Sequence, residues 1–245
     1  MSTKYNNKNL SHIIYNGVEL DHLRYNGVEV FTRYDLPTNF IYVNGSGRLF
    51  NNNADLNVDA NCMYIIMFLG NKRSDGQEPN LSTNVSSSNS NILFSDYGPM
   101  QSNRRQTYLV FIPKLNFTCT VRATNDSQQS AVVILKSDGV MLNDAFSSSD
   151  FEFISSHNSN TISQSQNNNW GIGLVGTSWY DTSEPPTTIT TNGINLLNEI
   201  ITGDANAKIR FRFYIIQNAS FSVSGSASDS FYPVQNWGGL IIKYK

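Results

Sequence analysis

Charge is the scarcest property of this sequence. Asp, Glu, Lys and Arg make up 15% of its 245 residues, against about 25% in an average globular protein. The formal net charge is −2, and basic residues come in isolated pairs such as Lys72-Arg73 and Arg104-Arg105. Binding to nucleic acid normally requires a clustered basic face, so we expect no nucleic-acid partner.

The sequence also has few cysteines and no long apolar segment. Cys62 and Cys119 are the only two, and both lie in apolar runs, where a free thiol behaves as a small hydrophobic side chain. We expect two buried free thiols; a disulfide stays an open alternative, because spacing alone does not decide it. The longest apolar run, residues 62–69, is far shorter than the about 20 residues of a membrane helix. Residues 1–12 contain no apolar segment typical of a secretory leader, so neither membrane insertion nor a signal peptide is expected.

Groups that carry chemistry are scarce as well. Of the three histidines, His12, His22 and His157, the first two occupy equivalent places in a repeat, which accounts for them without a metal. The carboxylates are scattered, whereas glycoside hydrolysis needs two that face each other. Residues 55–61 place oxygen-bearing side chains at alternate positions, but Ala60 stands where a calcium loop has glycine, and an exposed strand explains the same alternation. We expect no catalytic residue, no metal site, no cofactor and no enzyme activity.

What the sequence does contain begins with a short repeat. Ile14-Tyr15-Asn16-Gly17-Val18-Glu19-Leu20 returns ten positions later as Arg24-Tyr25-Asn26-Gly27-Val28-Glu29-Val30. Asn-Gly between alternating apolar residues predicts a two-residue hairpin turn, because a type I′ turn needs positive φ at both central positions. Residues 12–32 are therefore predicted to form two small hairpins or one meander. A unit of this size is marginal alone and needs another surface to be stable.

Beyond Pro37 the predicted elements are almost all strands. Short runs rich in β-branched and aromatic residues alternate with turns rich in Gly, Asn, Ser, Asp and Pro, which is the pattern of a sandwich or barrel. The strands are expected at residues 40–43, 63–69, 91–94, 107–112, 117–123, 131–136, 151–154, 170–175, 207–217, 221–224 and 239–244. Residues 82–91 and 155–169 are polar and are predicted as long loops.

The same pattern of strands and turns indicates the fold class. The spacing of Ile194, Leu197, Ile200 and Ile201 permits one short helix over residues 192–203, with Gly203 after its end. We predict an all-β protein with an N-terminal hairpin module at residues 1–35. A β-sandwich, jelly-roll-like, is predicted for residues 36–245.

Large aromatic residues beside polar loops are candidates for contact with a ligand or partner. Trp170 follows three asparagines, and Trp179 and Tyr180 precede Asp181. An aromatic ring can stack on a sugar face while amides and carboxylates meet its hydroxyl groups, and aromatic residues are also enriched at protein interfaces. A third interpretation places Trp170 in the core and Trp179 and Tyr180 over a sheet edge. The sequence leaves glycan contact, partner contact and a structural role open.

The repeated Tyr-Asn-Gly-Val-Glu phrase, whose second copy leads into Val30-Phe31, resembles the N-terminal phrases of many bacteriophage tail, baseplate and fibre proteins. These come from phages of Gram-positive or gut bacteria. The resemblance covers about thirty residues. It implies a virion protein whose N-terminal module attaches to the particle and whose larger β domain is exposed.

Together these observations predict a structural protein of a phage particle, in the tail or baseplate, which contacts the host surface and is made in the host cytoplasm. The hairpin module is expected to dock on other virion proteins by strand addition or apolar contact, and a homo-oligomer would add avidity. The residues expected at the attachment surface are Tyr15, Val18, Leu20, Tyr25, Val28 and Val30. Two alternatives are a decoration or head-fibre protein of the capsid and a carbohydrate-binding module for a host-surface glycan.

Overall fold

The structure is a computed structural model. It describes residues 4–5, 8–9, 13–15, 18–20, 22–25, 28–32, 36–37, 40–47, 53–71, 78, 80–98, 104–124, 131–138, 146–157, 161–164, 171–180, 187–191, 194–203, 207–216, 221–225 and 236–245. Side chains are described for residues 36–37, 40–41, 43, 55–70, 78, 80–98, 105–122, 132–138, 146–157, 171–175 and 239–245. Regular structure in this part is β-strand, apart from the 3-10 turn η1 (Ser148–Asp150). None of the described elements is a helix long and apolar enough to cross a membrane.

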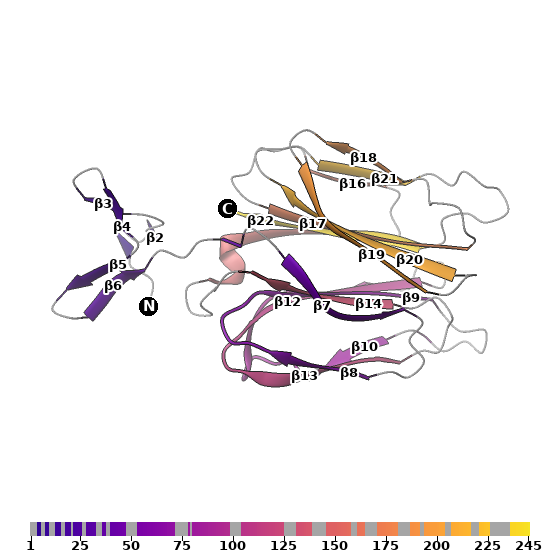
Figure 1. The fold of residues 1–245 in the computed structure, drawn as a ribbon, viewed down its shortest axis with the longest axis horizontal. Helices are drawn as coiled ribbons and strands as arrows, with labels where there is room; N and C mark the ends of the chain where they lie inside the picture. The colour runs from indigo at the N-terminus through magenta and orange to yellow at the C-terminus, as the bar shows by residue number, and fades with distance from the viewer. Residues whose placement is uncertain are drawn as a thin grey trace.

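The described residues between 4 and 32, which include the repeat, form separate two-stranded hairpins. Their strands are β1 (Lys4–Tyr5) with β2 (Lys8–Asn9), β3 (Ile13–Tyr15) with β4 (Val18–Leu20), and β5 (His22–Tyr25) with β6 (Val28–Thr32). Tyr15 pairs with Val18 and Tyr25 pairs with Val28, so in each copy of the repeat the Asn-Gly of the sequence stands between two paired residues. The predicted hairpin repeat is confirmed. Figure 1 shows these strands at one end of the molecule, beside the larger sheets.

The next eight strands build a sandwich of two antiparallel sheets. A five-stranded sheet has the order β11-β12-β9-β14-β7, and a three-stranded sheet has the order β10-β13-β8. The strands are β7 (Phe40–Gly47), β8 (Asn53–Val58), β9 (Tyr64–Asn71), β10 (Asn80–Thr83), β11 (Ser90–Tyr97), β12 (Arg104–Pro113), β13 (Phe117–Thr124) and β14 (Ala131–Ser137). Successive strands mostly alternate between the two sheets, which is the winding of a jelly roll.

The last eight strands repeat this arrangement. Their sheets have the orders β19-β20-β17-β22-β15 and β18-β21-β16. The strands are β15 (Phe151–His157), β16 (Thr161–Gln164), β17 (Gly171–Tyr180), β18 (Thr187–Thr191), β19 (Ile194–Gly203), β20 (Ala207–Ile216), β21 (Phe221–Gly225) and β22 (Asn236–Tyr244). Counted from the first strand of each set, the two sets have identical strand orders in both sheets.

A repeated irregularity supports an internal duplication. In β11 the pairing skips Leu93, and in β19 it skips Leu197. Each is a β-bulge in the fifth strand of its set, and bulges are retained features of a fold rather than accidents. The all-β, jelly-roll-like prediction is confirmed. The single sandwich expected for residues 36–245 is resolved into two jelly rolls of the same topology.

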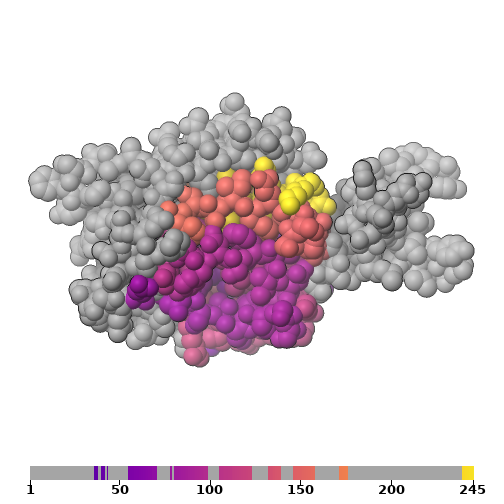
Figure 2. Space-filling view, turned by 180° about the vertical axis from the view of Figure 1, so that it is seen from behind, coloured from indigo at the N-terminus to yellow at the C-terminus, as the bar shows by residue number. Residues whose placement is uncertain are grey.

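The two jelly rolls pack face to face through their five-stranded sheets, giving four layers (Figure 1). Apolar side chains from β7, β9, β11, β12 and β14 meet those from β15, β17 and β22 in one buried cluster. A second cluster fills the space between the two sheets of the first jelly roll. Figure 2 shows the described atoms of residues 146–157 lying directly against the first jelly roll.

Strand β9 explains the longest apolar run of the sequence. Ile65 and Met67 belong to the cluster between the jelly rolls, whereas Tyr64, Ile66 and Phe68 belong to the cluster inside the first jelly roll. Successive residues of a strand point to opposite faces, so a strand that is covered on both faces is apolar throughout. The run is a doubly buried strand.

The helix that the sequence permitted over residues 192–203 is not formed. Ile194–Gly203 is strand β19 and pairs along β20. The bulge at Leu197 shifts the two-residue alternation of the strand by one position. This shift produces the three- and four-residue spacing of apolar residues that suggested a helix.

Candidate functional site

Backbone register places the six predicted attachment residues. Tyr15 pairs with Val18, and Leu20 pairs with Ile13. In the second hairpin Tyr25 pairs with Val28, whereas Val30 falls in a register shift. A two-stranded hairpin has an open edge on each side, where unpaired backbone groups offer a template for another strand. Within the described part of the chain, none of the larger sheets includes β3, β4, β5 or β6.

The aromatic candidates are only partly described. Trp179 and Tyr180 are the last residues of β17, where they pair with Lys208 and Ala207 on β20. Trp170 and Asp181 lie outside the described residues. Glycan contact, partner contact and a structural role therefore stay predictions for these four residues.

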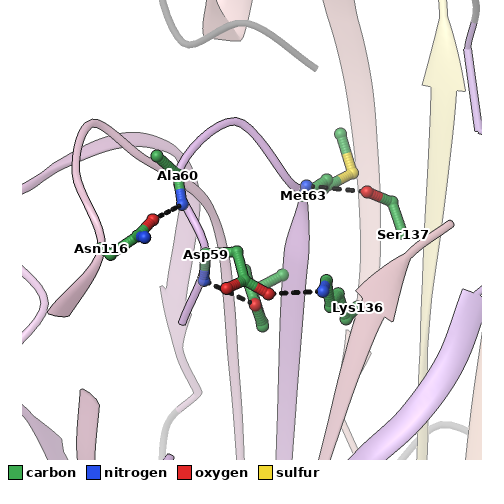
Figure 3. Close-up of polar contacts among 7 residues, drawn as sticks. Asp59, Ala60, Met63, Asn116, Lys136 and Ser137 are labelled. Atoms are coloured by element: carbon green, nitrogen blue, oxygen red, sulfur yellow. Dashed lines mark hydrogen bonds and ion pairs between the residues drawn. The ribbon is translucent and has the colours of Figure 1, made fainter. Parts of the chain in front are cut away.

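A network of polar contacts fixes the turn between β8 and β9 (Figure 3). Lys136 Nζ lies 2.5 Å from Asp59 Oδ2, and this hydrogen bond raises the pKa of Lys136. The backbone N–H of Asp59 donates to the hydroxyl oxygen of Tyr64 at 3.0 Å. The N–H of Ala60 donates to Asn116 Oδ1 at 2.7 Å. The residues between the two strands are thereby tied to β14 and to the turn before β13.

The groups around this turn are arranged to stabilise the fold. Lys136 is an ion-pair partner of Asp59, and the hydrogen bond to that carboxylate favours the charged form of the lysine. Cys62 and Cys119 are free, as predicted; Cys119 is buried and Cys62 is half-buried. Burial raises the pKa of Cys62, and it raises the pKa of Cys119 to about 11. Both thiols are protonated at neutral pH, whereas the thiolate is the reactive form.

A second polar cluster joins the two jelly rolls. Asp96 on β11 accepts a hydrogen bond from Ser155 Oγ, and the same carboxylate oxygen lies 2.7 Å from His157 Nε2. Ser155 and His157 are both on β15. In a catalytic triad the serine proton goes to the imidazole, but here the hydroxyl donates to the carboxylate. Asp96, Ser155 and His157 therefore form a polar contact between β11 and β15, called the clasp below, rather than an activated nucleophile.

Tyr108 and Gly98 complete this clasp. Burial raises the pKa of Tyr108 well above its ordinary value, so its hydroxyl stays protonated and donates to the Ser156 carbonyl at 2.8 Å. The ring of His157 lies 5.4 Å from that of Tyr108. Gly98 leaves room for this imidazole, because a Cβ there would lie 2.4 Å from His157 Nδ1 and 2.9 Å from the carbonyl oxygen of Gln106.

Gly98→Ala is therefore expected to destabilise the protein by about 1–3 kcal/mol, the usual cost of overpacking a filled site. The free energy of unfolding in urea measures the effect. Ser95→Ala, at an exposed position of β11, the strand that ends just before Gly98, serves as the control and should change stability by less than about 0.5 kcal/mol. The penalty should shrink in a His157→Ala background. A Gly98→Ala protein as stable as the control would contradict the close approach of the imidazole.

A third cluster lies on the opposite face of β11. The guanidinium carbon of Arg105 stacks 4.5 Å from the centroid of the Tyr97 ring. Arg105 also donates to the Tyr97 hydroxyl at 2.7 Å and to Glu78 Oε2 at 3.0 Å. The Tyr97 hydroxyl donates to Asn80 Oδ1. The Arg105 side chain is only 13% exposed, whereas Tyr97 is 46% exposed, so the cluster holds an outward-facing ring in one orientation.

Next to this cluster, β10 and β13 carry a polar depression of about 270 Å³. It is lined by Ser82, Thr83, Asn84, Thr120 and Arg122. Asn84 follows β10 and extends its pairing, since Asn84 Nδ2 donates to the Thr118 carbonyl and Asn84 Oδ1 accepts from the Thr120 N–H, both at 2.9 Å. The lining carries hydroxyl, amide and guanidinium groups, and the two hydrogen bonds of Asn84 to β13 hold this part of the surface in place.

Sequence reasoning singled out neither Tyr97 nor Asp96, and it set Arg105 aside as part of an isolated basic pair. One pattern could have joined Tyr97 to Arg105: successive antiparallel strands bring the end of β11 beside the start of β12. Asn80 and His157 come from other strands and Glu78 precedes β10, and no local pattern links these three residues to Tyr97 or Asp96. No group of three or more His, Cys, Asp or Glu side chains that could hold a metal occurs among the described residues.

Comparison with protein-family models, with curated proteins and with solved structures gave no match for this chain.

Proposed function

We propose that this chain is a non-enzymatic structural protein of a bacteriophage particle, placed in the tail or baseplate, with the hairpin repeat as its attachment module. The observation that carries the proposal is the pairing of the hairpins. Within the described sheets, β3 and β4 pair only with each other, and so do β5 and β6. Their open edges suit the addition of strands from a neighbouring virion protein.

The body of the protein supports the same proposal. Jelly rolls build viral capsid and lectin domains, although a fold by itself does not assign a function. Two of them share one extensive apolar layer here, which gives a stiff body suited to a particle component. The two cysteine thiols are protonated at neutral pH, and Lys136 is held in an ion pair with Asp59.

Deleting residues 1–35 is expected to lower incorporation into particles by about tenfold or more. The physical reason is that losing the docking strands removes more than about 1.4 kcal/mol of binding free energy per copy. The measurement is the amount of the protein in purified particles after complementation of a null phage. The double variant Val18→Asp/Val28→Asp, at equivalent positions of the two hairpins, should show the same loss.

The matched control is Glu19→Gln/Glu29→Gln, which changes the neighbouring residue in each copy and should incorporate normally. Normal incorporation of the deletion variant would overturn the attachment role of the hairpins. Immunogold labelling of intact particles then separates the tail or baseplate from the head. Label on the head would replace the proposed location with that of a decoration or head-fibre protein.

A further inference from the structure

The outer face of the first jelly roll carries a polar strip along β10 and β13. These strands belong to a three-stranded sheet that is an outermost layer in Figure 1. On β10, Asn80 and Ser82 are exposed while Leu81 between them is buried. On β13, Arg122 is exposed while Val121 is buried. One face of these strands is therefore core and the other consists of amide, hydroxyl and guanidinium groups.

Hydrogen bonds and an aromatic contact hold the two ends of the strip in place. At one end, Arg105 and Asn80 hold the Tyr97 ring. Because Arg105 covers one face of the ring, the exposed area of Tyr97 comes from its edge and its other face. At the far end, Asn84 is bonded to β13 on both sides of its amide. Asn80 and Asn84 are four residues apart, about 13 Å along a strand.

We propose that this strip, from the Tyr97 ring to the depression beside Asn84, binds an oligosaccharide. The exposed ring provides a flat apolar surface on which a sugar can stack, and fixing it in advance lowers the ordering cost of binding. Ser82, Thr120 and Arg122 provide donors and acceptors for sugar hydroxyl groups. The length of the strip suits a short chain of sugars rather than a single one.

The charge of the depression narrows the ligand class. Arg122 is the only ionisable side chain among the five residues that line it. Arginine meets carboxylate and phosphate groups with paired hydrogen bonds, so sugars that carry an acidic group are favoured over neutral ones. The polar lining argues against a protein partner, because the buried core of a protein interface is more apolar than this surface.

This inference deepens the proposed function, because contact with the host surface requires a ligand there. The test uses the full-length purified protein on an array of bacterial surface oligosaccharides, followed by calorimetric titration with the best acidic oligosaccharide and its neutral counterpart. We expect binding, tighter for the acidic ligand. Tyr97→Ala and Arg122→Gln should each weaken it by about tenfold, as truncation of a central contact residue does.

Two further variants separate binding from folding. Tyr97→Phe keeps the ring but removes its hydroxyl bonds, and it should lose less affinity than Tyr97→Ala. Ile92→Ala changes another exposed residue of β11 and should leave binding unchanged. Silence of the wild-type protein across the array, or binding that survives both Tyr97→Ala and Arg122→Gln, would overturn the site. Because incorporation into particles is measured separately, failure here leaves the attachment proposal standing, and failed incorporation leaves this site standing.

Discussion

Ile65→Asp is expected to abolish folding of the whole chain at room temperature. Ile65 is fully buried in the apolar layer that joins the two jelly rolls. A carboxylate placed there has no cation to pair with among the apolar residues of that layer, and its effective burial penalty is several kcal/mol. The net stability of a domain is only about 5–15 kcal/mol, so one buried charge consumes much of it, and lost packing adds to the cost.

Far-ultraviolet circular dichroism and the yield of soluble protein measure this outcome. Ile41→Asp is the matched control, because Ile41 lies on β7 of the same sheet and is 47% exposed. The control should fold and change stability by less than about 0.5 kcal/mol. A folded, cooperatively melting Ile65→Asp protein would mean that the two five-stranded sheets do not pack as described.

Phe111→Ala is expected to lower the free energy of unfolding by about 3–5 kcal/mol, the range for deleting a buried phenylalanine side chain. Phe111 is fully buried between the two sheets of the first jelly roll. Its ring stacks on that of Tyr64, with centroids 5.5 Å apart. Truncation therefore leaves a cavity and also removes an aromatic contact. Urea unfolding followed by tryptophan fluorescence measures the change.

The control for this substitution is Leu115→Ala, two residues after the end of β12, where the leucine is 50% exposed. It should cost less than about 0.5 kcal/mol. A Phe111→Ala loss below about 1 kcal/mol would show that the space between these sheets is not closely filled.

The predicted strands and the missed strands differ in their place in the sheets. The predicted runs correspond to strands such as β9, β12, β14 and β22, which carry apolar residues on one or both faces. Strands β10, β16 and β18 were not predicted, and β8 was raised only as an exposed strand over residues 55–61; all four are edges of the outer three-stranded sheets. An edge strand in an outer layer buries few side chains, so its composition stays polar and resembles a loop. Residues 82–91 and 155–169, predicted as loops, contain part of β10 and the whole of β16 for this reason, and they also include the first residues of β11 and the last residues of β15.

The internal duplication could not be recognised in the sequence, because equivalent positions of the two jelly rolls share apolar character but seldom the same residue. The strand registers make Ile65 equivalent to Leu174 and Leu135 equivalent to Leu240, and all four lie in the layer between the jelly rolls. By the same registers the residue of the second jelly roll that is equivalent to Tyr64 is Gly173. Burial requires an apolar residue rather than one particular residue, so an alignment of the two halves has little sequence identity. The topology and the paired bulges preserve the relationship.

The clasp between the jelly rolls could not be predicted for a different reason. By the same registers, the counterparts of Asp96 and His157 are Ile200 and Gly45. The polar contact between β11 and β15 therefore has no counterpart between the equivalent strands β19 and β7, so no repeated sequence pattern indicates it. The polar strip is equally non-local, because Tyr97, Asn84 and Arg122 belong to three separate segments of the chain.

The closure of each jelly roll has a consequence for synthesis on the ribosome. In each half the first strand pairs with the last: β7 with β14, and β15 with β22. Neither half can close until its final strand has emerged, but the first can close while the second is still being translated. During that interval the Met63, Ile65 and Met67 side of the early half faces water. We expect nascent chains whose residues up to about 150 have emerged to expose this apolar face and to recruit chaperones, and the second jelly roll to bury the face when it folds.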